Sequence, residues 1–154
     1  MGKKVLIIST SLRKNGNSDM LAQAFAKGAE AAGNDVEIIS LADKKIAFCR
    51  GCFACQKTGR GIIADDAVQI TEKISEAEAV VWATPIYYYE MTGQMKTMID
   101  RANALFVMDY QFRDVYMLST AAEEDASACE RAVNGLMGWI ACFPKSRFAG
   151  CVFA

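Results

Sequence analysis

Polar side chains and two cations stand between an apolar run and a helical pattern near the start of the chain. The run Val5–Ile8 is typical of a buried strand, and apolar residues recur at helical spacing after residue 18. The side chains between them can donate hydrogen bonds to an anion or neutralise its charge: Ser11, Arg13, Asn15, Asn17 and Ser18. A helix N-terminus adds free N–H groups and a positive dipole end. We predict a phosphate-bearing cofactor above the first strand, with Ser18 as a simple helix cap as the alternative.

A second segment, between residues 83 and 93, combines a stiff turn with aromatic rings. Pro85 restricts the backbone, and Tyr87, Tyr88 and Tyr89 follow in succession. Three consecutive tyrosines cannot all face one core, so we expect at least one to be a structural anchor and others to line a site. Their rings suit a planar ligand such as a flavin.

A third polar segment follows the apolar run Val115–Leu118. Ser119, Thr120 and Ala121 are small, so they let the edge of a ring approach the backbone. The acids that come next, Glu123 to Asp125, are expected to complement the dipole of the following helix.

Three cysteines, Cys49, Cys52 and Cys55, have the spacing that opens an iron–sulfur motif. A cluster takes a fourth ligand, but the next cysteine is residue 129 and the chain contains no histidine. A zinc site meets the same shortage. We therefore expect no metal or cluster, and interpret these residues as loop-forming or reactive thiols. The other cysteines fall in apolar patterns and are expected in the core: Cys129, Cys142 and Cys151.

Composition limits the remaining classes of function. The 154 residues are 53% hydrophobic and 23% charged, which indicates one globular domain over residues 1–154. The net charge of −1, without a basic stripe, argues against nucleic acid as a partner. No apolar stretch reaches the ~20 residues of a membrane span, and no signal peptide is recognisable, so we expect a cytoplasmic protein with reduced thiols. The absence of histidine excludes histidine-based triads and bases.

The elements that position these segments alternate along the chain. Strands are predicted over Val5–Ile8, Val36–Ile39, Ala79–Ala83, Val115–Leu118 and Ala149–Phe153, with helices between them. This pattern predicts an α/β fold: a three-layer, doubly wound parallel sheet in the flavodoxin-like order 2-1-3-4-5. Ligands then bind at the carboxyl ends of strands one and three.

Two features depart from a regular doubly wound sheet. Residues 41–65 form a connection far longer than the ~2–6 residues usual between strand and helix, which indicates a functional loop. The sequence also ends just after the fifth predicted strand, so the last helix of such a fold is expected to be missing. We expect either a truncated chain or a partner subunit over that face.

Several of these segments together resemble the NADPH-dependent FMN reductase family, near its iron–sulfur flavoprotein branch. Residues 11–18 match the family's phosphate loop, with Leu12 in place of proline. Residues 84–88 match its flavin loop, and Lys96 to Arg101 the helix that follows. The cysteine stretch that ends in Asp65 matches the family's cysteine loop, except that Gly61 stands where cluster-binding members carry their fourth cysteine.

The resemblance implies a cofactor and its ligands. FMN phosphate would bind Ser11, Arg13, Asn17 and Ser18. The ring system and ribityl chain would lie beside Thr84, Pro85, Ile86, Tyr87 and Tyr88, and the ring edge beside Ser119, Thr120 and Ala121. The family is usually dimeric or tetrameric, so a homodimer or homotetramer is expected.

The predicted function is an FMN-dependent oxidoreductase that takes a hydride from NAD(P)H and reduces a quinone, a flavin or another small acceptor. The cofactor performs this chemistry, so no side chain is assigned as catalytic. Three alternatives remain: an electron carrier without nicotinamide activity, an iron–sulfur flavoprotein, and a non-enzymatic sensor that uses the three clustered cysteines.

Overall fold

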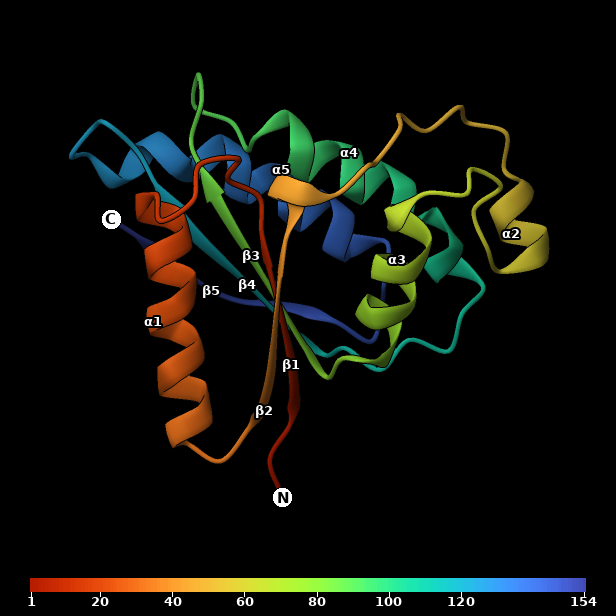
Figure 1. Ribbon diagram of the computed structural model, residues 1–154, viewed down its shortest axis with the longest axis horizontal. Helices are drawn as coiled ribbons and strands as arrows, with labels where there is room; N and C mark the ends of the chain where they lie inside the picture. The colour runs from red at the N-terminus through yellow and green to blue at the C-terminus, as the bar shows by residue number, and fades with distance from the viewer.

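The computed structural model describes residues 1–154, in which strands and helices alternate around one sheet (Figure 1). The strands are β1 (Lys4–Ser9), β2 (Asp35–Ser40), β3 (Ala79–Pro85), β4 (Asp114–Thr120) and β5 (Arg147–Phe153). The α-helices are α1 (Asn17–Ala31), α2 (Ala54–Thr58), α3 (Asp66–Glu76), α4 (Gly93–Arg101) and α5 (Glu130–Ala141). Short 3₁₀ turns cover Leu41–Asp43, Ala102–Phe106 and Ala126–Cys129.

The five strands form one parallel sheet in the order β2-β1-β3-β4-β5, which confirms the predicted topology. All seven residues of β3 are buried, because this central strand has neighbours on both sides and helices on both faces. The edge strands β2 and β5 are mostly exposed or half-buried. The strands are parallel, so the loops after β1, β3 and β4 leave from the same edge of the sheet.

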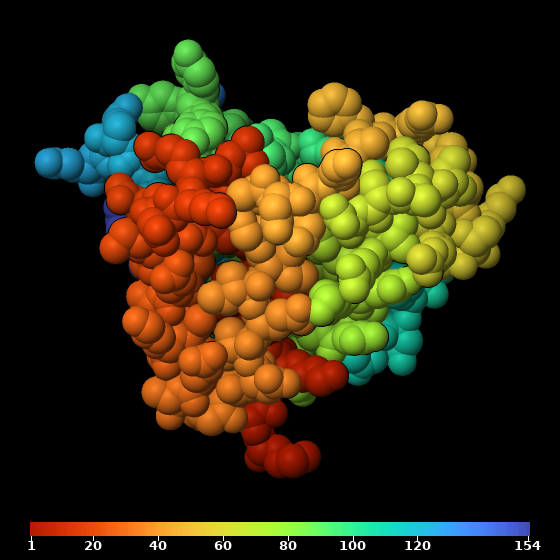
Figure 2. All heavy atoms as spheres, in the orientation of Figure 1, coloured from red at the N-terminus to blue at the C-terminus, as the bar shows by residue number.

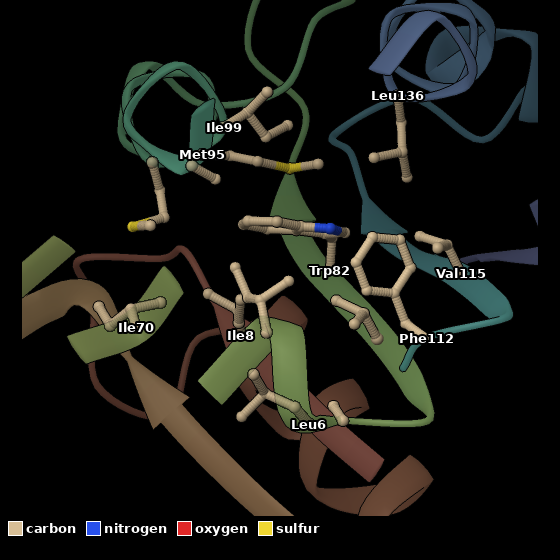
Figure 3. Packing of buried hydrophobic residues seen from close by; sticks show 14 of the residues in the cluster. Leu6, Ile8, Ile70, Trp82, Met95, Ile99, Phe112, Val115 and Leu136 are labelled. Atoms are coloured by element: carbon tan, nitrogen blue, oxygen red, sulfur yellow. The ribbon is translucent and has the colours of Figure 1, made fainter. Parts of the chain in front are cut away.

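The helices make the outer two of three layers, as predicted. α1 is the one helix on its face, where it packs on an apolar cluster that includes Val5, Ile7 and Val81. The larger cluster lies on the opposite face beneath α3, α4 and α5. Trp82 is fully buried in this cluster, and Figure 3 shows its indole between Met95 and Ile8. This packing fixes β3 and therefore the loop that follows it.

Side chains cap two of the helical segments near the candidate site. The Thr92 hydroxyl accepts a hydrogen bond from Met95 N at the start of α4, and the Asp125 carboxylate caps the 3₁₀ turn that leads into α5. The alternative reading of Ser18 as a cap is wrong, since the cap residue of α1 is Gly16, without a side-chain bond. Ser18 lies in the first helical turn, where its side chain is buried.

Two of the three cysteines expected in the core are exposed. Cys129 is buried, but Cys142 follows the last residue of α5 and lies in solvent. Cys151 lies on the edge strand β5, which has a neighbour on one side only. The expectation was based on apolar neighbours alone, which indicate a strand or a helix but not how much of it is covered. Cys142 lies just past the end of α5, and β5 is an edge strand whose residues are exposed or half-buried.

The long connection after β2 contains structure of its own, namely the turn at residues 41–43 and the short helix α2. In Figure 1, α2 lies at the far right, away from the loops after β3 and β4. None of the helices has both the length and the apolar character that crossing a membrane requires.

Candidate functional site

The β1–α1 loop (residues 10–16) presents a set of backbone donors without partners. The N–H groups of Ser11, Leu12 and Lys14, and those of helical residues 17–19, donate no hydrogen bond within the chain. Asn15 has a φ of 56°, a left-handed conformation that asparagine tolerates and that turns the chain into α1. Free N–H groups at the start of a fifteen-residue helix are the arrangement that binds phosphate in α/β proteins.

Side-chain hydrogen bonds stabilise the conformation of the β1–α1 loop. The Asp19 carboxylate accepts hydrogen bonds from the Ser9 hydroxyl at 3.1 Å and from Asn15 N at 3.3 Å. The Ser11 hydroxyl is engaged within the loop, where it accepts from Arg13 N and donates to Arg13 O. Arg13 is exposed and forms no ion pair, so its charge is available to an anion.

The loops after β1, β3 and β4 meet at one edge of the sheet, as predicted. Thr10 N donates to Ala83 O at 2.9 Å, and Ile86 N donates to Thr120 O at 2.8 Å. In Figure 2 these loops, coloured red, green and light blue, gather at the upper left. The structure therefore brings the predicted phosphate-binding and ring-binding segments together.

Three predicted site residues turn their side chains inward. Thr84 and Ser119 are fully buried and Thr120 nearly so. The Ser119 hydroxyl lies 3.7 Å from Cys151 Sγ and 3.4 Å from Val152 O, toward β5. Their side chains support the loops, so a ligand at this edge would meet mainly backbone groups of these residues.

The tyrosine hairpin (residues 87–90) corrects the expectation of a buried anchor. Tyr87, Tyr88 and Tyr89 are 52%, 96% and 46% exposed, because Tyr87 and Glu90 pair across a tight turn that projects from the sheet edge. Figure 1 shows this turn as the thin green loop at the top. All three rings are thus free of the core.

The backbone of this hairpin is strained. Tyr88 and Tyr89 have φ angles of 51° and 66°, in the left-handed region that bulky residues rarely adopt. The Tyr89 hydroxyl donates to Glu123 Oε1 at 2.6 Å, which joins the hairpin to the loop after β4. This bond and the nearby Glu123 charge raise the pKa of Tyr89 above its ordinary value. Strain held in place by such a contact is typical of functional loops.

The cysteine loop (residues 44–64) lies at the other end of the molecule. Cys49 and Cys52 are exposed, and Cys55 is half-buried. Gly51 N donates to Cys49 Sγ and Asn103 Nδ2 donates to Cys55 Sγ, both at 3.4 Å.

The three cysteines of this loop are not gathered into a site for a metal ion in this structure. No three histidine, cysteine, aspartate or glutamate side chains are close enough together to hold a metal ion. A Cβ built on Gly61 would have its nearest contacts at 3.7 and 3.8 Å, so a side chain has room there. Position 61 therefore lacks a thiol because it holds glycine, although a side chain would fit there.

A buried ion pair closes the cysteine loop. Arg101 donates two hydrogen bonds to the Asp65 carboxylate, at 2.6 and 2.8 Å, and two more to Ala47 O and Ile63 O. The Asp65 carboxylate also caps α3 by accepting from Ala67 N. Burial alone raises the pKa of Asp65, but the bonds from Arg101 and from two backbone N–H groups outweigh it and hold that pKa below its usual range.

Sequence reasoning missed the bracing role of Asp19 and the pairing of Asp65 with Arg101. An acid in the first turn of a helix was a signal for Asp19, because side chains at that position reach back to the residues before the helix. Nothing in the sequence signals a contact between residues 36 positions apart.

Fold and site together define a class: a doubly wound flavodoxin-like protein with an anion-binding loop after its first strand. A family model described as NADPH-dependent FMN reductase matches residues 3–152. The chain belongs to this family.

Individual relatives agree with this assignment. An iron–sulfur flavoprotein of Archaeoglobus fulgidus is 39% identical over 98 residues, which are 64% of this chain and 44% of the relative. One of Methanocaldococcus jannaschii is 34% identical over 111 residues, 72% of this chain and 57% of the relative. The chain thus spans about half the length of the curated relatives it matches.

A solved structure shares the fold at low sequence identity. The NAD(P)H:quinone oxidoreductase of Methanothermobacter marburgensis superposes with a TM-score of 0.76 at 14% identity, over 100% of this chain and 83% of that protein. At this identity the likeness concerns the fold alone.

Proposed function

We propose that this chain is an FMN-dependent oxidoreductase that takes a hydride from NAD(P)H and passes electrons to a quinone, a flavin or another small acceptor. The observation that carries the proposal is the set of unpartnered N–H groups at the start of α1, next to the unpaired charge of Arg13. A phosphate monoester supplies the acceptors and the negative charge that these groups lack.

The residues present fit FMN in three groups. The phosphate would be held by the β1–α1 loop and the first turn of α1, through Ser11, Arg13, Asn15, Asn17 and Ser18. The ring and ribityl chain would lie against Thr84, Pro85, Ile86, Tyr87 and Tyr88. The ring edge would face the backbone of Ser119, Thr120 and Ala121.

Bound at this edge, FMN would supply hydride acceptance and electron release, which amino-acid side chains cannot supply. The chain's own task is to bind, orient and partly cover the cofactor. The Tyr89–Glu123 bond holds the loops after β3 and β4 together, which restricts how a planar ligand enters between them. No side chain needs to act as an acid or base, so we assign no catalytic residue.

The direct test is NAD(P)H oxidation by the FMN-loaded chain, followed by absorbance with and without a quinone. We expect slow oxidation without an acceptor and a faster rate when the quinone is added. FMN that stays bound without any oxidation of NADH or NADPH would contradict the proposal and favour a simple electron carrier.

An iron–sulfur flavoprotein is the second candidate, because several curated relatives bear that name and the chain carries three clustered cysteines. Two observations argue against this second candidate. The three thiols are not close enough together to hold a metal ion, and position 61 carries glycine where cluster-binding members have a cysteine. Iron and acid-labile sulfide analysis of protein purified without oxygen separates the two candidates.

We also propose a cytoplasmic homodimer or homotetramer. All six cysteines are free thiols, as is usual in a reducing compartment. Light scattering of the purified chain measures the subunit number directly, and a monomer would contradict the assembly.

A further inference from the structure

Two buried threonines with no assigned role lie directly beneath the candidate site. Thr10 follows β1 and precedes the first predicted phosphate ligand, Ser11, while Thr92 is the cap residue just before α4. Thr10 is fully buried and Thr92 is 1% exposed. A third buried threonine, Thr84, is the last residue but one of β3 and is bonded to Thr92. Buried hydroxyls are costly unless they are hydrogen-bonded, so their partners matter.

The hydroxyls form one chain with a defined direction. Thr10 Oγ1 donates to Ala83 O at 3.0 Å, which leaves its oxygen to accept from Thr92 Oγ1 at 3.1 Å. Thr92 Oγ1 in turn accepts from Met95 N at 3.1 Å. Each hydroxyl in this chain both donates and accepts, so its proton position is determined by its neighbours.

A parallel branch connects the same helix to β3. Thr92 N donates to Thr84 Oγ1 at 3.1 Å, and the Thr84 hydroxyl donates to Pro85 O at 2.8 Å. Thr92 is therefore bonded both to the residue before the phosphate loop and to the strand end that opens the ring loop. Thr92 thus joins the two segments in two ways, through its hydroxyl to Thr10 and through its backbone N–H to Thr84.

We propose that Thr10 and Thr92 are positioning residues that fix the phosphate-binding loop relative to the ring-binding loop. Their side-chain bond, between residues 82 positions apart, sets the distance at which one FMN molecule reaches both segments. The inference rests on the proposed function, because it presumes that FMN phosphate binds residues 11–19 and the flavin ring residues 84–88.

A purely structural role makes a different prediction from a positioning role. Thr92 also caps α4, so its loss would disturb the helix itself. Thr10 has no such second task, and Thr10→Val removes the hydroxyl while leaving the cap of α4 intact. Riboflavin, which lacks the phosphate, occupies only the ring segment, so comparison of FMN with riboflavin isolates the alignment of the two loops.

The experiment measures the Kd of FMN and of riboflavin for the full apo chain by quenching of flavin fluorescence. Thr10→Val removes both hydrogen bonds of this hydroxyl. We expect it to weaken FMN binding about tenfold and to leave riboflavin binding within about twofold. Thr10→Ser keeps the hydroxyl and should match the wild type for both flavins. If the valine variant does not fold, Thr10→Ala removes the same group without added bulk and carries the same expectation.

Two results would overturn the inference alone. Thr10→Val, or Thr10→Ala in its place, would bind both flavins as the wild type does, or it would lose affinity for FMN and for riboflavin by the same factor. A wild-type chain that binds neither flavin would instead overturn the proposed function, and this inference with it.

Discussion

Arg13 is exposed, makes no ion pair and belongs to the β1–α1 loop, whose N–H groups at Ser11, Leu12 and Lys14 have no partner. A hydrogen bond to a charged group contributes about 1.5–3 kcal/mol, so we expect Arg13→Ala to weaken FMN binding by roughly tenfold to a hundredfold. Lys14→Ala is the matched control, since it removes the same charge from the next residue. Equal losses of FMN affinity in Arg13→Ala and Lys14→Ala would mean that only the net charge of the loop affects binding.

The Asp65 carboxylate makes stability depend on pH. Its pKa is lowered on folding, so its contribution is complete above the unfolded pKa of about 3.9 and is lost as the pH falls through the folded value. Asp65→Asn should therefore unfold at lower urea concentration than the wild type at pH 7, with a smaller difference at pH 3.

Lys96→Met provides the control for that comparison, because the pair of Lys96 with Asp100 is exposed and contributes little. Its urea midpoint should stay close to that of the wild type at pH 7. The ion-pair account would be contradicted if the urea midpoints of Asp65→Asn and the wild type differed by the same amount at pH 7 and at pH 3.

At the scale of elements, the turn of the tyrosine hairpin exposes its rings but lowers the stability of the fold. Two consecutive tyrosines in the left-handed region cost about 1–2 kcal/mol each. Tyr88→Asn puts a residue that tolerates this conformation at a 96% exposed site, so it should stabilise the chain by about 1 kcal/mol in urea unfolding. Tyr87 does not have a positive φ, so Tyr87→Asn is the control and should not raise the free energy of unfolding. Similar increases in Tyr87→Asn and Tyr88→Asn would contradict the account of backbone strain at Tyr88.

The elements that the sequence predicts are those determined by local pattern. Continuous apolar runs identify β1, β3 and β4, and Thr92 and Asp125 are recognisable as caps because capping is a local contact. The alternation of strands and helices predicts a parallel, doubly wound sheet, and the flavodoxin-like order is one of the few common orders for such a sheet.

What the sequence could not predict depends on distant contacts. The ion pair of Asp65 with Arg101 and the bond of Thr10 with Thr92 form only after the sheet has set the register of its loops. The hairpin turn was missed because tyrosine is a poor marker for positive φ. The exposure of Cys151 was missed because apolar neighbours indicate a strand but not how much of that strand is covered. Local patterns thus locate the candidate site, whereas its support comes from tertiary structure.

At the scale of the whole molecule, the cysteine loop and the candidate flavin site lie at separate ends (Figure 1). Replacement of Cys49, Cys52 and Cys55 by serine should therefore leave FMN content and NADPH oxidation within about twofold of the wild type. Both are measured on the folded variant, with circular dichroism as the control for folding. Complete loss of activity in a folded triple variant would make the thiols part of the reaction.

The central claim is that this chain holds FMN at the carboxyl edge of its sheet and that NADPH reduces it there. The most direct test is the visible spectrum of protein purified without oxygen, recorded before and after addition of NADPH. We predict a two-band flavin spectrum that bleaches. A colourless protein that also fails to take up added FMN would contradict the account, and broad brown absorbance beneath the flavin bands would contradict its cluster-free form.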